Sequence, residues 1–299
     1  MIQQSGEDLQ SVDSPSLHDW PGVAVKLDFA IEPRDAFLRL CHLPYCLFFD
    51  SAVNDPALGR YSFMAVDPFD TLIAAAEDRS IWDKLAAISK RFTASTIPEL
   101  PPFQGGIAGL FSYELSRTLE RLPRPRIDEF QVPGLAVGLY DVVVAFDHLN
   151  EKAWIISQGF PEQGAGPRHD RARYRAEAIR KLLAASESKR SKISRRPGPT
   201  TGEQIEVNSV PVDRLQSKVL AGTGVLSNFS RDEYLAMVQR GIDYVYAGDV
   251  FQVNLAQRLL YPAGDDAVSL YLRLRERNPA PFAAYFDLGD FQIVSASPE

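Results

Sequence analysis

The sequence consists largely of short β-rich segments separated by turn-forming residues. Segments 47–51, 60–66 and 153–158 are apolar or alternate between apolar and polar residues, and Asn, Asp, Pro and Gly lie between such segments. Strands that follow one another without a helix in each connection favour antiparallel sheets over βαβ winding. The chain is therefore expected to fold as an α+β protein built on antiparallel sheets.

Helical spacing of apolar residues and end signals define the predicted helices. A capping box at Ser230 and Glu233, with Gly248 at the other end, marks the clearest of them. Helices are predicted at 33–40, 81–92, 168–185, 230–247 and 268–277. Strands are predicted at 47–51, 60–66, 105–115, 135–146, 153–158 and 250–260, with a hairpin of 285–288 and 291–296.

The predicted strand 250–260 has one apolar and one polar face. Phe251 and Val253 share the apolar face, while Gln252 and Asn254 share the polar face. In β-strands this alternation is typical of a half-buried position. A polar strand face near Gln252 and Asn254 is the most specific feature that spacing alone provides.

Composition excludes several classes of protein. The 299 residues carry a formal charge of −7, which argues against broad nucleic-acid binding, and hydrophobic residues make up 45%, which suits a globular core. No run approaches the roughly 20 apolar residues of a membrane span. The polar beginning of the chain lacks the pattern of a signal peptide, so a cytoplasmic protein is expected. Cys41 and Cys46 are expected to be reduced core residues.

Two segments have the composition of loosely ordered chain. Residues 1–22 are polar and are predicted to form a disordered leader. Residues 186–228 are rich in Ser, Lys, Arg, Pro and Gly and are predicted to form a flexible linker. Its basic run at 189–196 is alternatively a nucleic-acid-binding arm, although no aromatic residue lies within it.

Motifs of the common catalytic and nucleotide-binding types are absent from the sequence. There is no Walker A, HExxH, GxSxG or GxGxxG pattern, and the four histidines lack the spacing of metal ligands. Gly105, Gly106 and Gly109 are compatible with a phosphate cradle or with a strand that approaches its neighbour closely.

Several motifs in order resemble the chorismate-utilising enzymes. They are residues 49–51, 59–63, 105–106, 111–114, 248–258, 278–282 and 295–299. The resemblance covers residues 45–299 and implies antiparallel sheets packed as a sandwich with flanking helices, as in anthranilate synthase component I. It divides the chain into an N-terminal-like region at 23–185 and the start of the chorismate-binding domain at 229–299. The family continues for roughly another 150 residues, about one domain, so the fold is expected to be incomplete at the C-terminus.

Within the family, residues 252–258 distinguish two branches. Anthranilate synthase component I typically reads QVVxSQR there, whereas this chain carries Asn254 and resembles aminodeoxychorismate synthase component I. The first expectation is therefore a large subunit that converts chorismate and ammonia to 4-amino-4-deoxychorismate in para-aminobenzoate and folate synthesis. Anthranilate synthase component I is the alternative. Two further alternatives are binding proteins and not enzymes. One is a non-catalytic fragment that binds tryptophan or a partner, and the other is a generic metabolite-binding domain.

The resemblance also implies roles for particular residues. Glu299 is the candidate general acid for the departing hydroxyl of chorismate, or else a carboxylate at the end of a strand bonded to nearby amides. Gln252 and Asn254 are substrate-pocket candidates, or simply polar strand residues. A glutamine amidotransferase subunit would supply ammonia. Mg²⁺ is the implied cofactor, but its ligands and the family's nucleophilic lysine lie outside residues 1–299, so the chain alone is expected to lack synthase activity.

The family also binds tryptophan, and the resemblance places that site in this chain. An apolar wall with a few polar groups suits such a ligand, and the same residues are alternatively part of the core. The candidates are Ser51, Tyr61, Ser62, Pro281 and Phe282.

Overall fold

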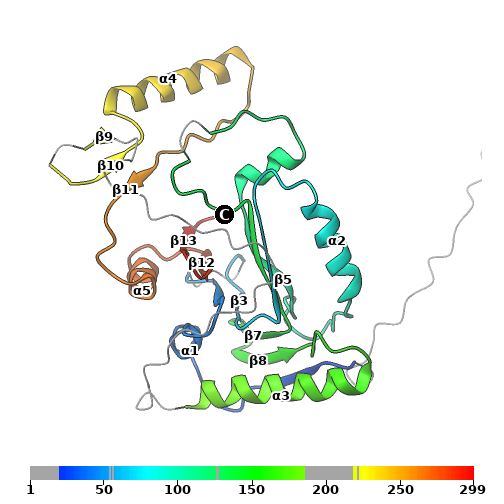
Figure 1. Cartoon of the computed structure of the whole chain (residues 1–299). Coiled ribbons are helices and arrows are strands. Elements are labelled where there is room, and N and C mark those ends of the chain that lie inside the picture. Colours follow the sequence, from blue (N-terminus) through cyan, green and yellow to red (C-terminus); the bar gives the residue numbers. More distant parts are fainter. Residues whose placement is uncertain (1–19, 54, 56, 126–127, 186–217, 221) are drawn as a thin grey trace, which may run out of the picture. The chain divides into compact units, whose positions relative to one another are not determined.

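The computed structural model describes residues 20–53, 55, 57–125, 128–185, 218–220 and 222–299 (Figure 1). These form two compact units. The first takes its residues from 1–122, 133–206 and 267–299, and the second from 123–132 and 207–266. Most of the predicted leader 1–22 and linker 186–228 lies outside the described residues, and the predicted domain boundaries stay a prediction.

A seven-stranded antiparallel sheet forms the centre of the first unit. The strands, in spatial order, are β1 (Val23–Lys26), β8 (Lys152–Ser157), β7 (Val142–Asp147), β3 (Tyr61–Ala65), β2 (Leu47–Asp50), β12 (Phe282–Asp287) and β13 (Gln292–Ser297). Helices α1 (Pro33–Leu40), α3 (Ala165–Ala184) and α5 (Ala267–Arg277) pack against it, and Figure 1 shows α3 lying along β8. Phe37 of α1 is fully buried among the rings of Phe48, Tyr271 and Tyr285.

A three-stranded sheet packs on the first sheet and completes a sandwich. Its order is β4 (Asp70–Ala74), β6 (Leu135–Tyr140) and β5 (Gly106–Phe111). Ala108 and Ala136 of this sheet share one buried cluster with Leu47 and Val143 of the other. Helix α2 (Ile81–Arg91) packs through Ile81 with side chains of β4 and β6. The expected α+β fold with antiparallel sheets in a sandwich is confirmed.

The predicted strand 135–146 is wrong as a single element, because it is two strands in two sheets. Asp141 lies between β6 and β7 and is fully buried. Its backbone carbonyl accepts from the Gln158 N–H at 2.7 Å, and its carboxylate pairs with Arg175 at 3.3 Å. The chain changes sheets at this residue, and the ion pair compensates the buried charge there. Likewise, the predicted strand 105–115 ends at Phe111, and a 3₁₀ helix (Tyr113–Thr118) follows.

The second unit contains helix α4 (Arg231–Ala247) and the short strands β9 (Lys218–Val219), β10 (Leu226–Ser227) and β11 (Leu259–Leu260). The predicted strand 250–260 is wrong except for β11. Residues 250–258 form no regular element, and Phe251 is fully exposed instead of facing a core. An alternating pattern forms a strand only where a neighbouring strand takes its hydrogen bonds, and among the described residues none pairs with 250–258.

The capping box predicted for α4 is present and yields a pH prediction. The Ser230 Oγ accepts from the Glu233 N–H at 3.3 Å, and the Ser230 N–H donates to Glu233 Oε2 at 2.8 Å. Hydrogen bonds from Lys218 and then from Ser230 lower the pKa of Glu233 to about 2. Because this lies below the unfolded value of about 4.3, the stabilisation is present above pH 4.3 and is lost as the pH falls towards 2.

A ¹³C-detected NMR titration of the Glu233 carboxyl group measures this directly. We expect a midpoint near 2 in the native chain, and a midpoint shifted towards the ordinary range in Ser230→Ala, which loses the bond from the hydroxyl but keeps those from Lys218 and from the backbone N–H. A native midpoint near 4 would contradict the prediction.

Candidate functional site

Ser51 and Ser62, two polar residues predicted to contact a bound tryptophan, lie near the C-terminal end of β2. This strand is paired with β3 on one side and with β12 on the other. Phe49 pairs with Phe63 of β3, and Asp50 pairs with Ala283 of β12. Beyond the strand, the Ala52 N–H donates to the Ala280 carbonyl at 3.1 Å. Three segments that are far apart in the sequence thus lie side by side at one end of these strands.

Ser51, Ser62 and His148 form a hydrogen-bonded chain at this end. The Ser51 N–H donates to Ser62 Oγ at 3.1 Å, and Ser62 Oγ lies 2.8 Å from His148 Nε2. The Ser51 hydroxyl donates to the Tyr61 carbonyl at 2.7 Å. Burial lowers the pKa of His148, which favours a neutral imidazole that can accept from the Ser62 hydroxyl.

A buried ion pair lies beside this chain. The Asp50 side chain is fully buried and accepts from the Tyr271 hydroxyl at 2.8 Å and from Arg275 Nε at 2.6 Å. Burial, followed by the charge of Asp50, raises the pKa of Tyr271, so that its hydroxyl stays a donor. Helix α5 supplies both partners from adjacent turns, since Tyr271 and Arg275 are four residues apart.

A second ion pair holds the segment that carries His148. Arg60 Nη2 lies 2.9 Å from Asp147 Oδ2, and the guanidinium of Arg60 stacks over the Tyr61 ring at 4.7 Å. Burial by itself raises the pKa of Asp147, but hydrogen bonds from Arg60 and Asn150 outweigh it and leave this pKa below its ordinary value. Asp147 is therefore an anion that anchors the turn after β7.

The structure brings the predicted tryptophan-site residues into one neighbourhood. Ser51, Tyr61 and Ser62 are linked by hydrogen bonds, and Pro281 and Phe282 directly follow Ala280, which bonds Ala52. The sequence did not predict four further residues of this neighbourhood, which are Asp50, His148, Tyr271 and Arg275. Only the spacing of Tyr271 and Arg275 on one helix face could have signalled them. The arrangement offers hydroxyl and imidazole groups for binding; its ligand stays a prediction.

Ser62→Ala is expected to lower the free energy of unfolding by about 1–3 kcal/mol, because the partly buried Ser51 N–H and His148 Nε2 would both lose their partner. Urea unfolding followed by tryptophan fluorescence measures it, since Trp20, Trp82 and Trp154 all lie in the first unit. Ser89→Ala on the exposed side of α2 is the control, with a change within about 0.5 kcal/mol. Equal effects of the two variants would contradict the prediction.

The predicted catalytic and substrate-pocket residues are exposed. Glu299 follows β13 in the first unit, and its backbone N–H donates to Ser297 Oγ at 3.4 Å. Gln252 and Asn254 lie in the second unit, where the Gln252 amide donates to Asn254 Oδ1 at 3.4 Å. Their expected place on the polar face of a strand is wrong, because residues 250–258 form no strand; their roles stay predictions.

The described part of the chain holds no group of three or more His, Cys, Asp or Glu side chains that could bind a metal ion. Cys41 and Cys46 are not joined by a disulfide bond; Cys46 is fully buried and Cys41 is half-buried. Among the described helices, none is both long and apolar enough to cross a membrane.

Comparison with known proteins gives a consistent result. Residues 45–299 match the family described as chorismate binding enzyme. The chain is 29% identical to anthranilate synthase component 1 of Neisseria meningitidis (89% of this chain, 53% of that protein) and 32% identical to that of Thermus thermophilus, with the same coverage. It is 27% identical to aminodeoxychorismate synthase component 1 of Escherichia coli, covering 88% of this chain and 52% of that protein.

The fold also resembles a solved structure. The crystal structure of anthranilate synthase component I from Streptococcus pneumoniae matches with a TM-score of 0.54 at 22% identity, covering 83% of this chain and 52% of that one. The chain spans about half the length of the curated relatives it matches.

Proposed function

Since the chain belongs to the chorismate-binding enzyme family, we propose that it is part of the large subunit of a synthase that aminates chorismate and that forms anthranilate. The family match over residues 45–299 carries this proposal. The relatives at 29% and 32% identity, both named anthranilate synthase component 1, support this branch. They favour it over the aminodeoxychorismate branch that the motif at 252–258 indicates.

Aminodeoxychorismate synthesis is the second candidate, and Asn254 is the observation that favours it. The segment 252–258 carries asparagine where anthranilate synthases typically have valine, and one relative at 27% identity is an aminodeoxychorismate synthase component 1. In this reading ammonia would replace the C4 hydroxyl of chorismate.

Under either branch, Glu299 would protonate the departing hydroxyl, and Gln252 and Asn254 would contact the substrate. A glutamine amidotransferase subunit would deliver ammonia, and we place the enzyme in the cytoplasm. Mg²⁺ would neutralise the substrate carboxylate, but the described residues offer no cluster of ligands for it. No role in binding Mg²⁺ is therefore assigned to a residue of this chain.

Growth complementation with the complete reading frame that encodes these residues distinguishes the two products. Escherichia coli strains that lack component I of either synthase would be grown without tryptophan or without para-aminobenzoate. Rescue of the tryptophan requirement supports anthranilate synthesis, and rescue of only the para-aminobenzoate requirement supports the second candidate. Mass spectrometry of the product formed from chorismate, ammonium and Mg²⁺ would identify it independently. Failure of the purified, folded product of that complete reading frame to consume chorismate would contradict both.

The polar neighbourhood of Ser51 is proposed as a tryptophan site. Its support is the contact of Ser51 with Tyr61 and Ser62, and the proximity of Pro281 and Phe282. Calorimetry with L-tryptophan tests it, with D-tryptophan as a control of equal apolar area. Absence of heat at millimolar tryptophan would leave these residues as part of the core only.

A further inference from the structure

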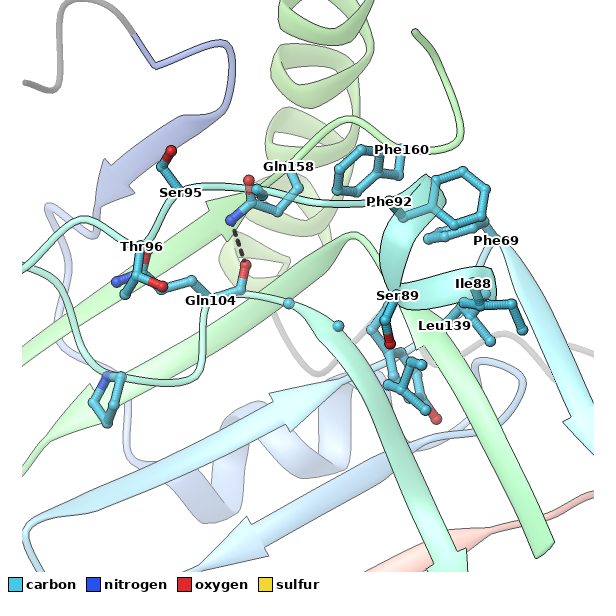
Figure 2. A pocket seen from close by; sticks show the side chains of 16 residues that line it. Phe69, Ile88, Ser89, Phe92, Ser95, Thr96, Gln104, Leu139, Gln158 and Phe160 are labelled. Atoms are coloured by element: carbon cyan, nitrogen blue, oxygen red, sulfur yellow. Dashed lines mark hydrogen bonds between the residues drawn. The ribbon is translucent and has the colours of Figure 1, made fainter. Parts of the chain in front are cut away.

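A cavity of about 300 Å³ opens in the first unit, apart from the polar neighbourhood of Ser51. It lies between the end of α2, the loop 94–105 and the beginning of β5 (Figure 2). It shares no lining residue with the candidate tryptophan site. Its volume is at the lower end of the range for small-molecule pockets, which suits a ligand of one ring.

One end of the cavity is a cluster of three aromatic rings. Phe69 and Phe92 have centroids 5.0 Å apart at 68°, and Phe92 and Phe160 have centroids 5.4 Å apart at 67° (Figure 2). The guanidinium of Arg168 covers the Phe160 ring at 4.1 Å and donates to the Gln158 carbonyl at 3.2 Å. These contacts fix the rings before a ligand arrives, and edge-to-face geometry favours a further aromatic ring.

The other end of the cavity carries two buried amides. The Gln104 side chain accepts a hydrogen bond from the Ile97 N–H and donates to the carbonyls of Ile97 and Pro101. Gln158, which is 4% exposed, accepts from the Trp20 indole and donates one amide hydrogen to the Gln104 carbonyl at 3.0 Å (Figure 2). Its second amide hydrogen has no acceptor within the described chain. An amide nitrogen carries two donor hydrogens, and a ligand carbonyl in the cavity would accept the second one.

A glycine pair forms part of the cavity wall. A side chain at Gly106 would meet nothing within 4 Å, and its φ of +127° is a conformation that favours glycine. The backbone there presents a flat wall without a side chain. All side chains that line the cavity are uncharged, and the Arg168 guanidinium behind Phe160 is not among them, so a charged ligand would be desolvated without a counter-ion in direct contact.

We propose that this cavity binds a planar, uncharged ligand with a single aromatic ring and one hydrogen-bond acceptor such as a carbonyl oxygen. The ring packs against Phe69, Phe92 and Phe160, and the carbonyl accepts from Gln158. This inference is independent of the proposed function, which concerns an anionic, non-aromatic substrate.

Benzamide is the probe, and methyl-resolved NMR of the native chain is the measurement. Benzamide is expected to shift the methyl signals of Ile88 and Leu139, which line the cavity. Cyclohexanecarboxamide, which is not planar, and benzoate, which is charged, are expected to bind at least tenfold more weakly. Ala94→Phe fills the cavity and is expected to weaken benzamide binding at least tenfold. Ala86→Phe is the control, because Ala86 is an exposed residue of α2 that does not line the cavity. It is expected to leave benzamide binding unchanged.

Each remaining outcome overturns the proposal. These are no shift with millimolar benzamide, equal binding of cyclohexanecarboxamide or benzoate, and unchanged binding to a folded Ala94→Phe variant. If Ala94→Phe does not fold, the test uses the native chain alone. The methyl signals that shift, and the relative binding of benzamide, cyclohexanecarboxamide and benzoate, then decide whether the cavity is the binding site. Shifts that avoid Ile88 and Leu139 would then count against the cavity.

Discussion

Glu299→Gln in the complete protein is expected to lower kcat for chorismate amination by about 10²–10⁴-fold, the usual contribution of a general acid. Glutamine keeps the shape of the side chain but cannot donate the proton that the departing hydroxyl needs. KM for chorismate should change much less than kcat, because the loss falls on the reacting step. Steady-state kinetics with ammonium as the nitrogen source measures both values without the amidotransferase subunit.

Asp290→Asn is the matched control, since Asp290 is an exposed carboxylate in the turn between β12 and β13. It should keep nearly full activity. The Glu299 carboxylate has no hydrogen bond or ion pair within the described residues, so Glu299→Gln should also unfold at an unchanged urea concentration. An active Glu299→Gln protein, with kcat above one tenth of the native value, would remove Glu299 from the chemistry.

Asp50→Asn is expected to lower the free energy of unfolding of the first unit by about 3–5 kcal/mol. Asp50 is fully buried and is the partner of both Arg275 and Tyr271. Removing its charge leaves the guanidinium, which is 22% exposed, without its counter-ion. Urea unfolding followed by tryptophan fluorescence measures the change.

Two further variants separate the ion pair from other effects. Asp28→Asn breaks the exposed pair with Arg180, where the side chains are 69% and 36% exposed, and should cost at most about 1 kcal/mol. Adding Arg275→Met to Asp50→Asn should recover part of the lost stability, because the uncompensated charge is removed. A double variant less stable than Asp50→Asn would show that Arg275 stabilises the fold by other contacts.

Local signals predicted the helices and the last hairpin well. The capping box at Ser230 and Glu233 and the glycine at 248 set both ends of α4, and both are present. The helices α1, α2, α3 and α5 match the predicted ranges with small shifts at their ends. In the hairpin around Gly289, β12 begins three residues earlier than predicted, and β13 is shifted by one residue. Such features depend on neighbours within a few residues, which the sequence shows directly.

Part of the candidate site was also readable from sequence, but only through the resemblance. The motifs that contain Ser51, Tyr61 and Ser62 indicated a shared neighbourhood, and the structure links them by hydrogen bonds. The ion pair of Asp50 with Arg275 was missed, because these residues are 225 positions apart and no local pattern relates them. The cavity beside Phe69, Phe92 and Phe160 was missed for the same reason.

By itself, the sequence determined the α+β class, the antiparallel character, the helix ends and, through its motifs, the family. Only the tertiary structure decided which alternating segments became strands. Residues 135–146 split at Asp141 into strands of two sheets, and residues 250–258 stayed irregular with Phe251 exposed. The physical reason is that a helix satisfies its own backbone hydrogen bonds, whereas a strand needs a partner from elsewhere in the chain.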